Sequence, residues 1–269
     1  MKHLLTIAGS DSSGGAGIQA DLKTFAAHGT FGMSAITAVT AQNTCGVTLI
    51  QDITPEMITA QIDAVFSDIH VDAVKIGMIS RSPSIRAIAE GLRKWKPGIV
   101  VLDPVMVSKS GFQLLQQEAC QTLIQELLPL ATLVTPNLPE AEAICGFPIT
   151  SEKDMVAAAK RIVELGAKAV MVKGSRLIDS QSNDYLYNGV QGIWLSSTRI
   201  ETKNTHGTGC TLSSALAANL AKGLSIEEAA KASKSYVTKA IAHSITLGKG
   251  CGPTHHFVDL YEKSGLLKS

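Results

Sequence analysis

Short apolar runs alternate with helical stripes along most of the chain, and this alternation limits the folds that it can adopt. Continuous apolar strands joined by helical crossovers are typical of a mostly parallel sheet with both faces covered. The predicted strands are Leu4–Ala8, Met33–Ala41, Ala73–Gly77, Gly98–Asp103, Ala131–Thr135 and Ala167–Lys173. The predicted helices with bounds are Pro55–Phe66, Ile85–Trp95, Gln116–Leu128 and Glu152–Leu165, and another begins near Ile18. We therefore expect an α/β fold.

A hairpin and a helical tail complete the pattern. Asp184–Tyr187 and Gly192–Leu195 flank Asn188 and Gly189, a pair that favours a tight turn, so this hairpin is expected at the sheet edge. The chain reads as helical from Leu212 onward, with a break at 248–253. With 269 residues, of which 45% are hydrophobic, the chain can bury a large core, and we expect a single domain over residues 1–269.

Composition argues against several classes of partner. The net charge is +1 and no Lys/Arg run stands out, so we expect neither nucleic acid nor an anionic membrane as a partner. No apolar run reaches the roughly 18 residues that a membrane span needs. The five cysteines are odd in number and lack a C-x-x-C pair, which argues against a disulfide framework or a structural zinc site. We expect a cytoplasmic protein.

The segment Asn204–Ser213 carries the clearest signal for a ligand. Gly207 and Gly209 stand among threonines directly before a helical apolar series, so this segment reads as a loop that leads into a helix N-terminus. Unpaired N–H groups and the helix dipole make such an end favourable for phosphate. Cys210 lies inside this loop, where the helix N-terminus is expected to lower the pKa of its thiol.

Polar residues follow most of the predicted strands, where open α/β sheets bind their ligands. Asp103, Asn137 and Glu140 would offer the oxygen ligands that Mg²⁺ on a triphosphate prefers. Asn137 and Glu140 also match a simple helix-capping pair, and Asp103 also matches a strand-ending turn. Lys173 would place a positive charge on a transferring phosphate, or would be an edge lysine with a solvated head.

Other nucleotide motifs are weak or missing. Gly15–Ala20 matches the dinucleotide fingerprint G-x-G-x-x-A, but a long polar loop precedes it and no acidic residue stands near Gln42, where the fingerprint would require one. The chain contains no G-x-x-x-x-G-K-[ST] motif, so a P-loop is excluded. A catalytic Cys–His–Asp set is not supported either, since His206 is only a sequence neighbour of Cys210.

Several long motifs together resemble one known family, the hydroxymethylpyrimidine/phosphomethylpyrimidine kinases of thiamine biosynthesis, a branch of the ribokinase-like superfamily. The resemblance covers nearly the whole chain. The motifs are Thr6–Phe25, Ala41–Thr44, Lys75–Met78, Asp103–Met106, Thr135–Glu140 and Thr202–Cys210. The resemblance implies a three-layer α/β/α fold and a homodimer. It also implies two successive phosphorylations of 4-amino-5-hydroxymethyl-2-methylpyrimidine by ATP with Mg²⁺.

The resemblance also assigns roles to individual residues. The pyrimidine would be bound by Gln42, Asp21 and Met78, and covered by a flap of Val105, Met106 and Ser108–Gly111. Phosphate and metal would be held by Asp103, Asn137, Glu140 and Thr205, and the transfer would be catalysed by Lys173, Gly207, Thr208, Gly209 and Cys210. Within this set, Asp103 and Glu140 are the expected metal ligands. The backbone of Gly207–Cys210 would form the anion hole.

Three alternatives remain open from the sequence. Related sugar kinases carry an aspartate base where this chain has Cys210, which favours a pyrimidine over a sugar as substrate. A pyridoxal or pyridoxine kinase of the same fold is the nearest alternative, although such kinases carry a second cysteine in the flap, where this chain has Ser108. Outside the kinases, the alternatives are a dinucleotide-dependent oxidoreductase and a ligand-binding protein without activity.

Overall fold

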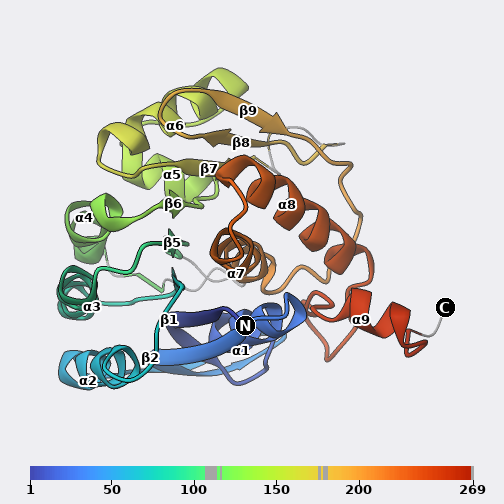
Figure 1. Cartoon of the computed structure of the whole chain (residues 1–269). Coiled ribbons are helices and arrows are strands. Elements are labelled where there is room, and N and C mark those ends of the chain that lie inside the picture. The colour runs from blue at the N-terminus through green and yellow to red at the C-terminus, as the bar shows by residue number, and fades with distance from the viewer. Residues whose placement is uncertain (107–113, 116, 175–176, 178–180, 268–269) are drawn as a thin grey trace.

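The central element of the fold is one twisted sheet that separates two layers of helices. The computed structural model describes residues 1–106, 114–115, 117–174, 177 and 181–267. Within these residues, nine strands lie in the order β3-β2-β1-β4-β5-β6-β7-β8-β9 (Figure 1). Their bounds are His3–Asp11 (β1), Phe31–Asn43 (β2), Gly46–Asp52 (β3), Ala73–Ile76 (β4), Val100–Leu102 (β5), Leu133–Val134 (β6), Val170–Lys173 (β7), Asp184–Tyr187 (β8) and Gly192–Leu195 (β9).

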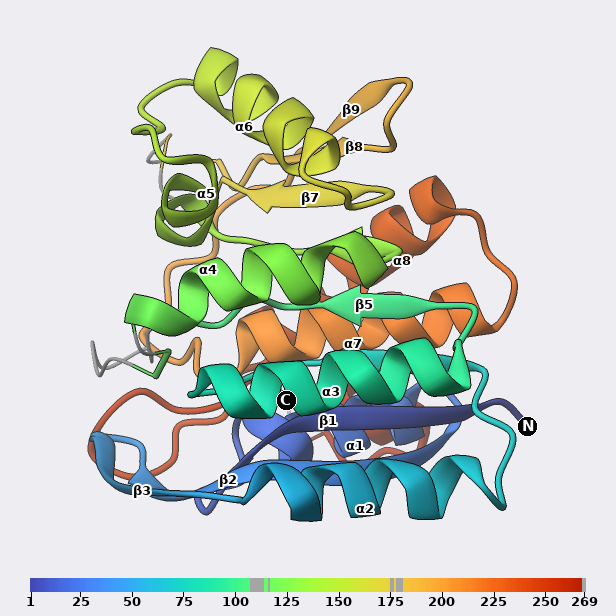
Figure 2. The ribbon, with the colours of Figure 1, turned by 90° about the vertical axis from the view of Figure 1, so that its left-hand side faces the viewer.

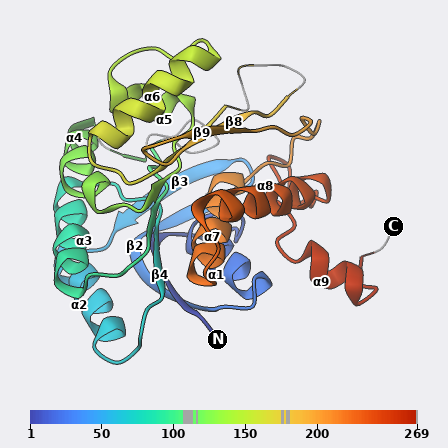
Figure 3. The ribbon, with the colours of Figure 1, turned by 45° about the horizontal axis from the view of Figure 1, so that its top comes forward.

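The helices cover both faces of this sheet. Figure 2 shows α2, α3, α4, α5 and α6 along one face, with α7 and α8 behind the sheet, and Figure 1 shows α1 on the same side as α7 and α8. The first layer consists of Pro55–Phe66 (α2), Ser82–Trp95 (α3), Gln117–Glu126 (α4), the short 3-10 helix Leu128–Leu130 (η1), Leu138–Cys145 (α5) and Glu152–Glu164 (α6). The second consists of Gly17–Ala27 (α1), Thr208–Ala221 (α7) and Ile226–Ala242 (α8). The last helix, Val258–Lys263 (α9), lies away from the sheet (Figure 3).

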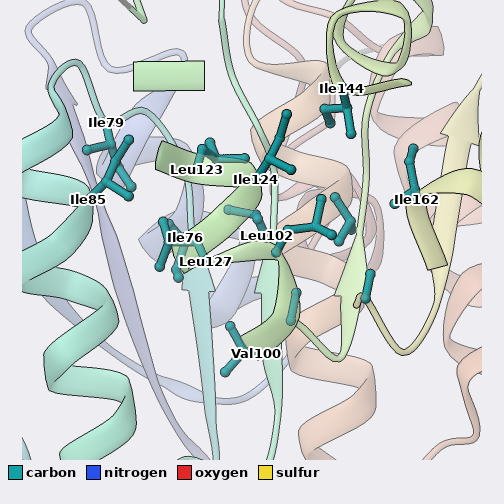
Figure 4. Packing of buried hydrophobic residues seen from close by; sticks show 14 of the residues in the cluster. Ile76, Ile79, Ile85, Val100, Leu102, Leu123, Ile124, Leu127, Ile144 and Ile162 are labelled. Atoms are coloured by element: carbon teal, nitrogen blue, oxygen red, sulfur yellow. The ribbon is translucent and has the colours of Figure 1, made fainter. Parts of the chain in front are cut away.

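Two apolar cores lie on opposite faces of the sheet because successive strand residues point to opposite sides. In β5, Val100 and Leu102 belong to the core under the first layer, whereas Val101 belongs to the core under α7 and α8. Figure 4 shows Val100 and Leu102 packed among Ile76, Leu123, Ile124 and Leu127. Each fully buried Leu or Ile contributes about 1.5–3 kcal/mol to stability. The strands therefore hold both helix layers.

The structure confirms the predicted mostly parallel sheet covered on both faces. It also confirms the hairpin, since β8 and β9 pair antiparallel and β9 is an edge strand. The opposite edge strand, β3, was not predicted. Its residues are half-buried or exposed, so no apolar run marks it. The part of the chain that is described contains no helix both long and apolar enough to cross a membrane.

The first strand extends further than its apolar run. After an irregularity between Ala8 and Ser10, β1 continues to pair with β2 through Ser10 and Asp11. The predicted loop therefore begins inside the strand. Because β1 lies between β2 and β4, the strand order reverses beside it, which is where open sheets of this kind bind ligands.

A buried ion pair links both helix α1 and helix α7 to the sheet. Lys75 of β4 and Asp21 of α1 have no exposed side-chain surface, and Lys75 Nζ lies 2.9 Å from the Asp21 carboxylate. The Asp21 carboxylate also accepts hydrogen bonds from Thr6 Oγ1 at 2.6 Å and from Ser214 Oγ at 2.7 Å. Burial opposes the charge of Lys75, but the negative charge of Asp21 outweighs it, so the pKa of Lys75 is raised well above its usual range.

We expect Lys75→Met to lower the free energy of unfolding by about 3–5 kcal/mol, because it leaves the Asp21 carboxylate buried without its cation. Urea denaturation measures this change. The matched control is Lys2→Met, which removes the partner of Asp72 from a pair whose lysine is 47% exposed, and which should cost less than about 1 kcal/mol. Equal losses in the two variants would contradict the assigned importance of the buried pair.

Candidate active site

Three segments far apart in the sequence meet at the carboxyl edge of the sheet. Asp103 directly follows β5, Lys173 ends β7, and Gly209 lies in the first turn of α7. Lys173 Nζ lies 3.0 Å from Asp103 Oδ1. A Cβ atom placed on Gly209 would lie 3.4 Å from Asp103 Oδ2 and 3.5 Å from Lys173 Nζ. The structure thus brings together the residues that were predicted to handle phosphate.

The Asp103 carboxylate is buried and holds Lys173 in place. Thr135 Oγ1 donates to Asp103 Oδ1 at 3.1 Å, and Ser213 Oγ lies 3.4 Å from Oδ2. Burial disfavours the charge of Lys173, but Asp103 and then Glu140 favour it, and the pKa of Lys173 is raised. Lys173 is therefore a cation at neutral pH.

A second buried ion pair supports the segment after Lys173. The backbone N–H of Gly174 donates to Asp184 Oδ1 at 3.1 Å, and Lys234 Nζ of α8 lies 2.6 Å from Asp184 Oδ2. Lys234 also donates to the carbonyl oxygen of Ser182 at 2.7 Å. Sequence reasoning missed this support, because a lysine on an otherwise ordinary helix carries no local signal for it.

Asn137 and Glu140 form a capping box at the start of α5, as one of the two interpretations predicted. Glu140 N donates to Asn137 Oδ1 at 3.0 Å, and Asn137 N donates to Glu140 Oε2 at 2.8 Å. Burial raises the pKa of Glu140 to about 7, with Lys173 opposing and Asp103 reinforcing the shift. Among the described residues, no group of three or more His, Cys, Asp or Glu side chains could hold a metal ion alone. The predicted metal role of Asp103 and Glu140 stays a prediction.

The N-terminus of α7 has no side-chain cap. Its N-cap residue, Gly207, has a φ of 76° and makes no side-chain capping bond, whereas α2, α6 and α8 are capped by Thr54, Ser151 and Ser225. Thr208 Oγ1 donates to the carbonyl oxygen of Thr205 at 2.8 Å. The N–H groups of the first turn have no acceptor within the helix and carry partial positive charge. They are available to an anion.

The predicted lowering of the Cys210 pKa is wrong. The residue keeps some exposed surface, yet burial of its thiol is the largest effect and raises the pKa to about 11. Lys75 opposes this shift, while the negative charges of Asp21 and Asp103 add to it. The positive end of the helix does not compensate, so the thiol is protonated at neutral pH.

Some of the predicted substrate residues gather beside the site. Met78 packs with Ala38 and Leu114 in a small apolar cluster, against which Val105 also packs. Gln42 is half-buried, and its side-chain amide contacts Thr40 and His206. Ser108–Gly111 of the predicted flap lies outside the described residues.

Two predicted substrate residues are placed elsewhere. Asp21 has no exposed surface, and its carboxylate is engaged by Lys75, Thr6 and Ser214, so it has a structural role and no free face for a ligand. Met106 packs in the large core under the first helix layer, apart from the cluster of Met78. Local sequence did not show either burial.

Sequence reasoning missed a contact between Asp11 and His206. His206 Nε2 lies 2.9 Å from Asp11 Oδ2, although 195 positions separate the two residues. Asp11 also accepts backbone hydrogen bonds from the glycine-rich loop that follows it. An Asp before Ser-Ser-Gly-Gly is a turn signal, but nothing in the sequence indicates its distant partner.

Comparison with known proteins identifies relatives across nearly the whole chain. A family model described as phosphomethylpyrimidine kinase matches residues 11–255. The hydroxymethylpyrimidine/phosphomethylpyrimidine kinase of Rhizobium meliloti is 54% identical over 256 residues, which cover 94% of this chain and 96% of that protein. The protein of the same name from Salmonella typhimurium is 49% identical over 258 residues, covering 95% of this chain and 97% of the relative.

Solved structures share the fold. An ADP complex of Bacillus subtilis pyridoxal kinase matches with a TM-score of 0.89 and 42% identity, covering 95% of this chain and 97% of that one. Phosphomethylpyrimidine kinase from Clostridium difficile 630 matches with a TM-score of 0.80 and 50% identity, covering 90% of this chain and 100% of that one. With its ribokinase-like fold and these relatives, the chain belongs to the phosphomethylpyrimidine kinase family.

Proposed function

We propose that this chain transfers the γ-phosphoryl group of ATP to 4-amino-5-hydroxymethyl-2-methylpyrimidine and then to the resulting monophosphate. The observation that carries this proposal is the uncapped start of α7 beside the Lys173–Asp103 pair. The names of the relatives supply the substrate. Nucleotide complexes of similar structures, with ADP and with AMP-PCP, supply the donor.

Alignment and charge stabilisation are the main tasks of such a site. Phosphoryl transfer passes through a loose transition state, in which negative charge spreads over the equatorial oxygens. The N–H groups of residues 208–210 would donate to these oxygens, and Lys173 would contact them as a cation. Asp103 would keep Lys173 in position through their 3.0 Å contact. Thr205, whose carbonyl oxygen accepts a bond from Thr208, would order the loop before the helix.

The residues present fit Mg²⁺ on the nucleotide. Mg²⁺ usually keeps several waters and is bound by one or two carboxylates together with substrate phosphates. Asp103 and Glu140 are two such carboxylates, and both act on the pKa of Lys173, which places them on the same part of the site. Bound Mg²⁺ would neutralise phosphate charge, and Asn137 would hold Glu140 in place through their capping box.

Cys210 would act as a neutral wall of the anion hole. A thiol with a pKa of about 11 is not a base at neutral pH. Loose phosphoryl transfer needs little help from a base. The N–H of Gly17 donates to this thiol and lowers its pKa slightly, so the N-termini of α1 and α7 both point toward Cys210.

The acceptor would lie between Gln42 and the apolar pair of Met78 and Val105. Gln42 supplies hydrogen-bonding groups for a polar ring edge, and the apolar side chains suit a ring face. A pyridoxal kinase is the second candidate, because similar structures at a TM-score of 0.89 carry that name. We favour the pyrimidine because the relatives with 54% and 49% identity are named for it.

We also propose that the protein works in the cytoplasm as a homodimer. All five cysteines are free thiols, which suits a reducing compartment. Leu49 of the edge strand β3 is 66% exposed and Val39 of β2 is 47% exposed, so an apolar patch is present for a second copy.

We expect Gly209→Ala to lower kcat about 100-fold, because the added Cβ occupies the space in front of Lys173 and Asp103 that a phosphate would need. The nearest atoms would lie at ordinary contact distances, so the melting temperature should not fall. Gly98→Ala, where a Cβ meets nothing within 4 Å, is the matched control and should keep wild-type kcat. Wild-type kcat in Gly209→Ala would contradict the anion hole.

The Cys210 thiol should react slowly with iodoacetamide at neutral pH, and its alkylation rate should rise without a plateau below about pH 10. Exposed Cys45 is the internal control, and peptide mass spectrometry separates the two. For the same reason, Cys210→Ser should lose less kcat than Gly209→Ala. A plateau of the Cys210 rate near neutral pH would show a thiolate and overturn this assignment.

With Mg-ATP and the aminopyrimidine alcohol, product analysis over time should show the monophosphate before the diphosphate. Pyridoxine should be used with a lower kcat/KM than the aminopyrimidine alcohol. A higher kcat/KM for pyridoxine would favour the second candidate, and accumulation of monophosphate alone would contradict the second transfer.

A further inference from the structure

The Asp11 carboxylate, at the end of β1, binds two loops at once. Its Oδ1 accepts from the N–H and the hydroxyl of Ser13, at 2.8 and 2.7 Å. Its Oδ2 accepts from the N–H groups of Gly15 and Ala16, at 3.0 and 2.8 Å, and contacts His206 Nε2 at 2.9 Å. Burial alone would raise the pKa of Asp11, but the bonds from His206 and Ser13 outweigh it and lower the pKa to about 2. Asp11 is therefore a carboxylate, which only accepts hydrogen bonds.

The loop of His206 interlocks with the loop of Gly15. A Cβ on Gly15 would lie 2.4 Å from His206 Cδ2, and a Cβ on Gly207 would lie 1.8 Å from the carbonyl oxygen of Gly15. The backbone of His206 is also fixed, since its N–H donates to the carbonyl oxygen of Gly252 at 3.0 Å. The bond between Asp11 and His206 is the polar link between the loop after β1 and the loop before α7.

This link determines the protonation of one ring nitrogen. Because Asp11 can only accept, His206 Nε2 must carry the hydrogen of their bond. The same Nε2 lies 3.3 Å from the side-chain amide of Gln42. An amide NH₂ group facing this N–H would place two donors against each other, so the amide oxygen of Gln42 is the group that suits this position.

The other side of the Gln42 amide agrees with this orientation. The two ends of a glutamine amide have nearly the same shape and are assigned by their hydrogen bonds. With Oε1 toward His206, the amide nitrogen faces Thr40 Oγ1 at 3.2 Å. Thr40 Oγ1 donates to the carbonyl oxygen of Ser10 at 2.9 Å, so its lone pairs are free to accept from Gln42. Every group in the chain from Asp11 to Ser10 is then paired.

We propose that Asp11 and His206 are positioning residues that set the orientation of the Gln42 amide while they hold the loop before α7 against the loop after β1. The proposal rests on the proposed function, in which Gln42 meets the ring of the acceptor. After its bonds to His206 and Thr40, the amide of Gln42 keeps one N–H and one oxygen lone pair. An adjacent donor and acceptor match a heteroaromatic ring edge that carries an amino group beside a ring nitrogen.

Two neutral substitutions of His206 test the proposal by reach. His206→Gln keeps an N–H donor at about the position of Nε2, whereas His206→Asn is too short to reach Asp11. We expect His206→Asn to raise the KM for the aminopyrimidine alcohol about tenfold or more, with a smaller change in the KM for ATP. His206→Gln should recover most of this loss. Equal kinetics of wild type and His206→Asn, or no recovery in His206→Gln, would overturn the proposal.

The matched control for the carboxylate is Asp72. Asp72 also accepts from a backbone N–H, that of His3 at 2.8 Å, and from a cation, Lys2 at 2.7 Å, but at the opposite end of β1. Asp11→Asn should raise the KM for the pyrimidine at least as much as His206→Asn does, and Asp72→Asn should leave it unchanged. An unchanged KM in Asp11→Asn would overturn the proposal.

A measurement without substrate separates this proposal from the proposed function. In the ligand-free protein labelled with ¹⁵N-histidine, NMR should show His206 protonated at Nε2, with an N–H proton whose signal shifts in Asp11→Asn. An Nε2 that carries no proton would overturn the proposal even if the kinase is active. Conversely, a wild-type protein without kinase activity would contradict the proposed function while the NMR result still tests the contact.

Discussion

The uncapped start of helix α7, held against the Lys173–Asp103 pair, is the constraint on which the site depends. The helix cannot move away from that position, because its residues from Thr211 to Ala221 are all buried. Its first turn therefore presents N–H groups without partners to the same space that Lys173 faces. An anion that enters this space meets a fixed cation and fixed dipoles, which is what stabilisation of a phosphoryl group requires.

Polar links between distant segments keep this arrangement in register. Lys75 and Asp21 join β4 to α1, and Ser214 extends the same network to α7. Lys234 and Asp184 fix the segment that follows Lys173. Asp11, bonded to His206, fixes the loop that precedes α7. The two apolar cores supply the burial, while these charged pairs determine how the ends of the strands and helices meet at the carboxyl edge.

The sequence predicts the parts of this protein that depend on local patterns. The helix Pro55–Phe66 and the hairpin at Asp184–Leu195 have the predicted bounds, and polar residues after the strands indicate where Asp103 and Lys173 meet. Burial and long-range contacts are not visible in local patterns. The pKa of Cys210 therefore shifts in the direction opposite to the prediction, Asp21 and Met106 lie inside the protein, and the bond between Asp11 and His206 was missed. The half-exposed strand β3 was missed because it has no apolar run.

A crystal structure of the protein with AMP-PCP, Mg²⁺ and the aminopyrimidine alcohol tests the central claim most directly. We expect the γ-phosphate oxygens within about 2.7–3.2 Å of the N–H groups of residues 208–210 and near Lys173 Nζ, with the alcohol oxygen in line for attack. A γ-phosphate bound away from the start of α7, with these N–H groups facing water, would contradict the assignment of this helix end as the anion hole.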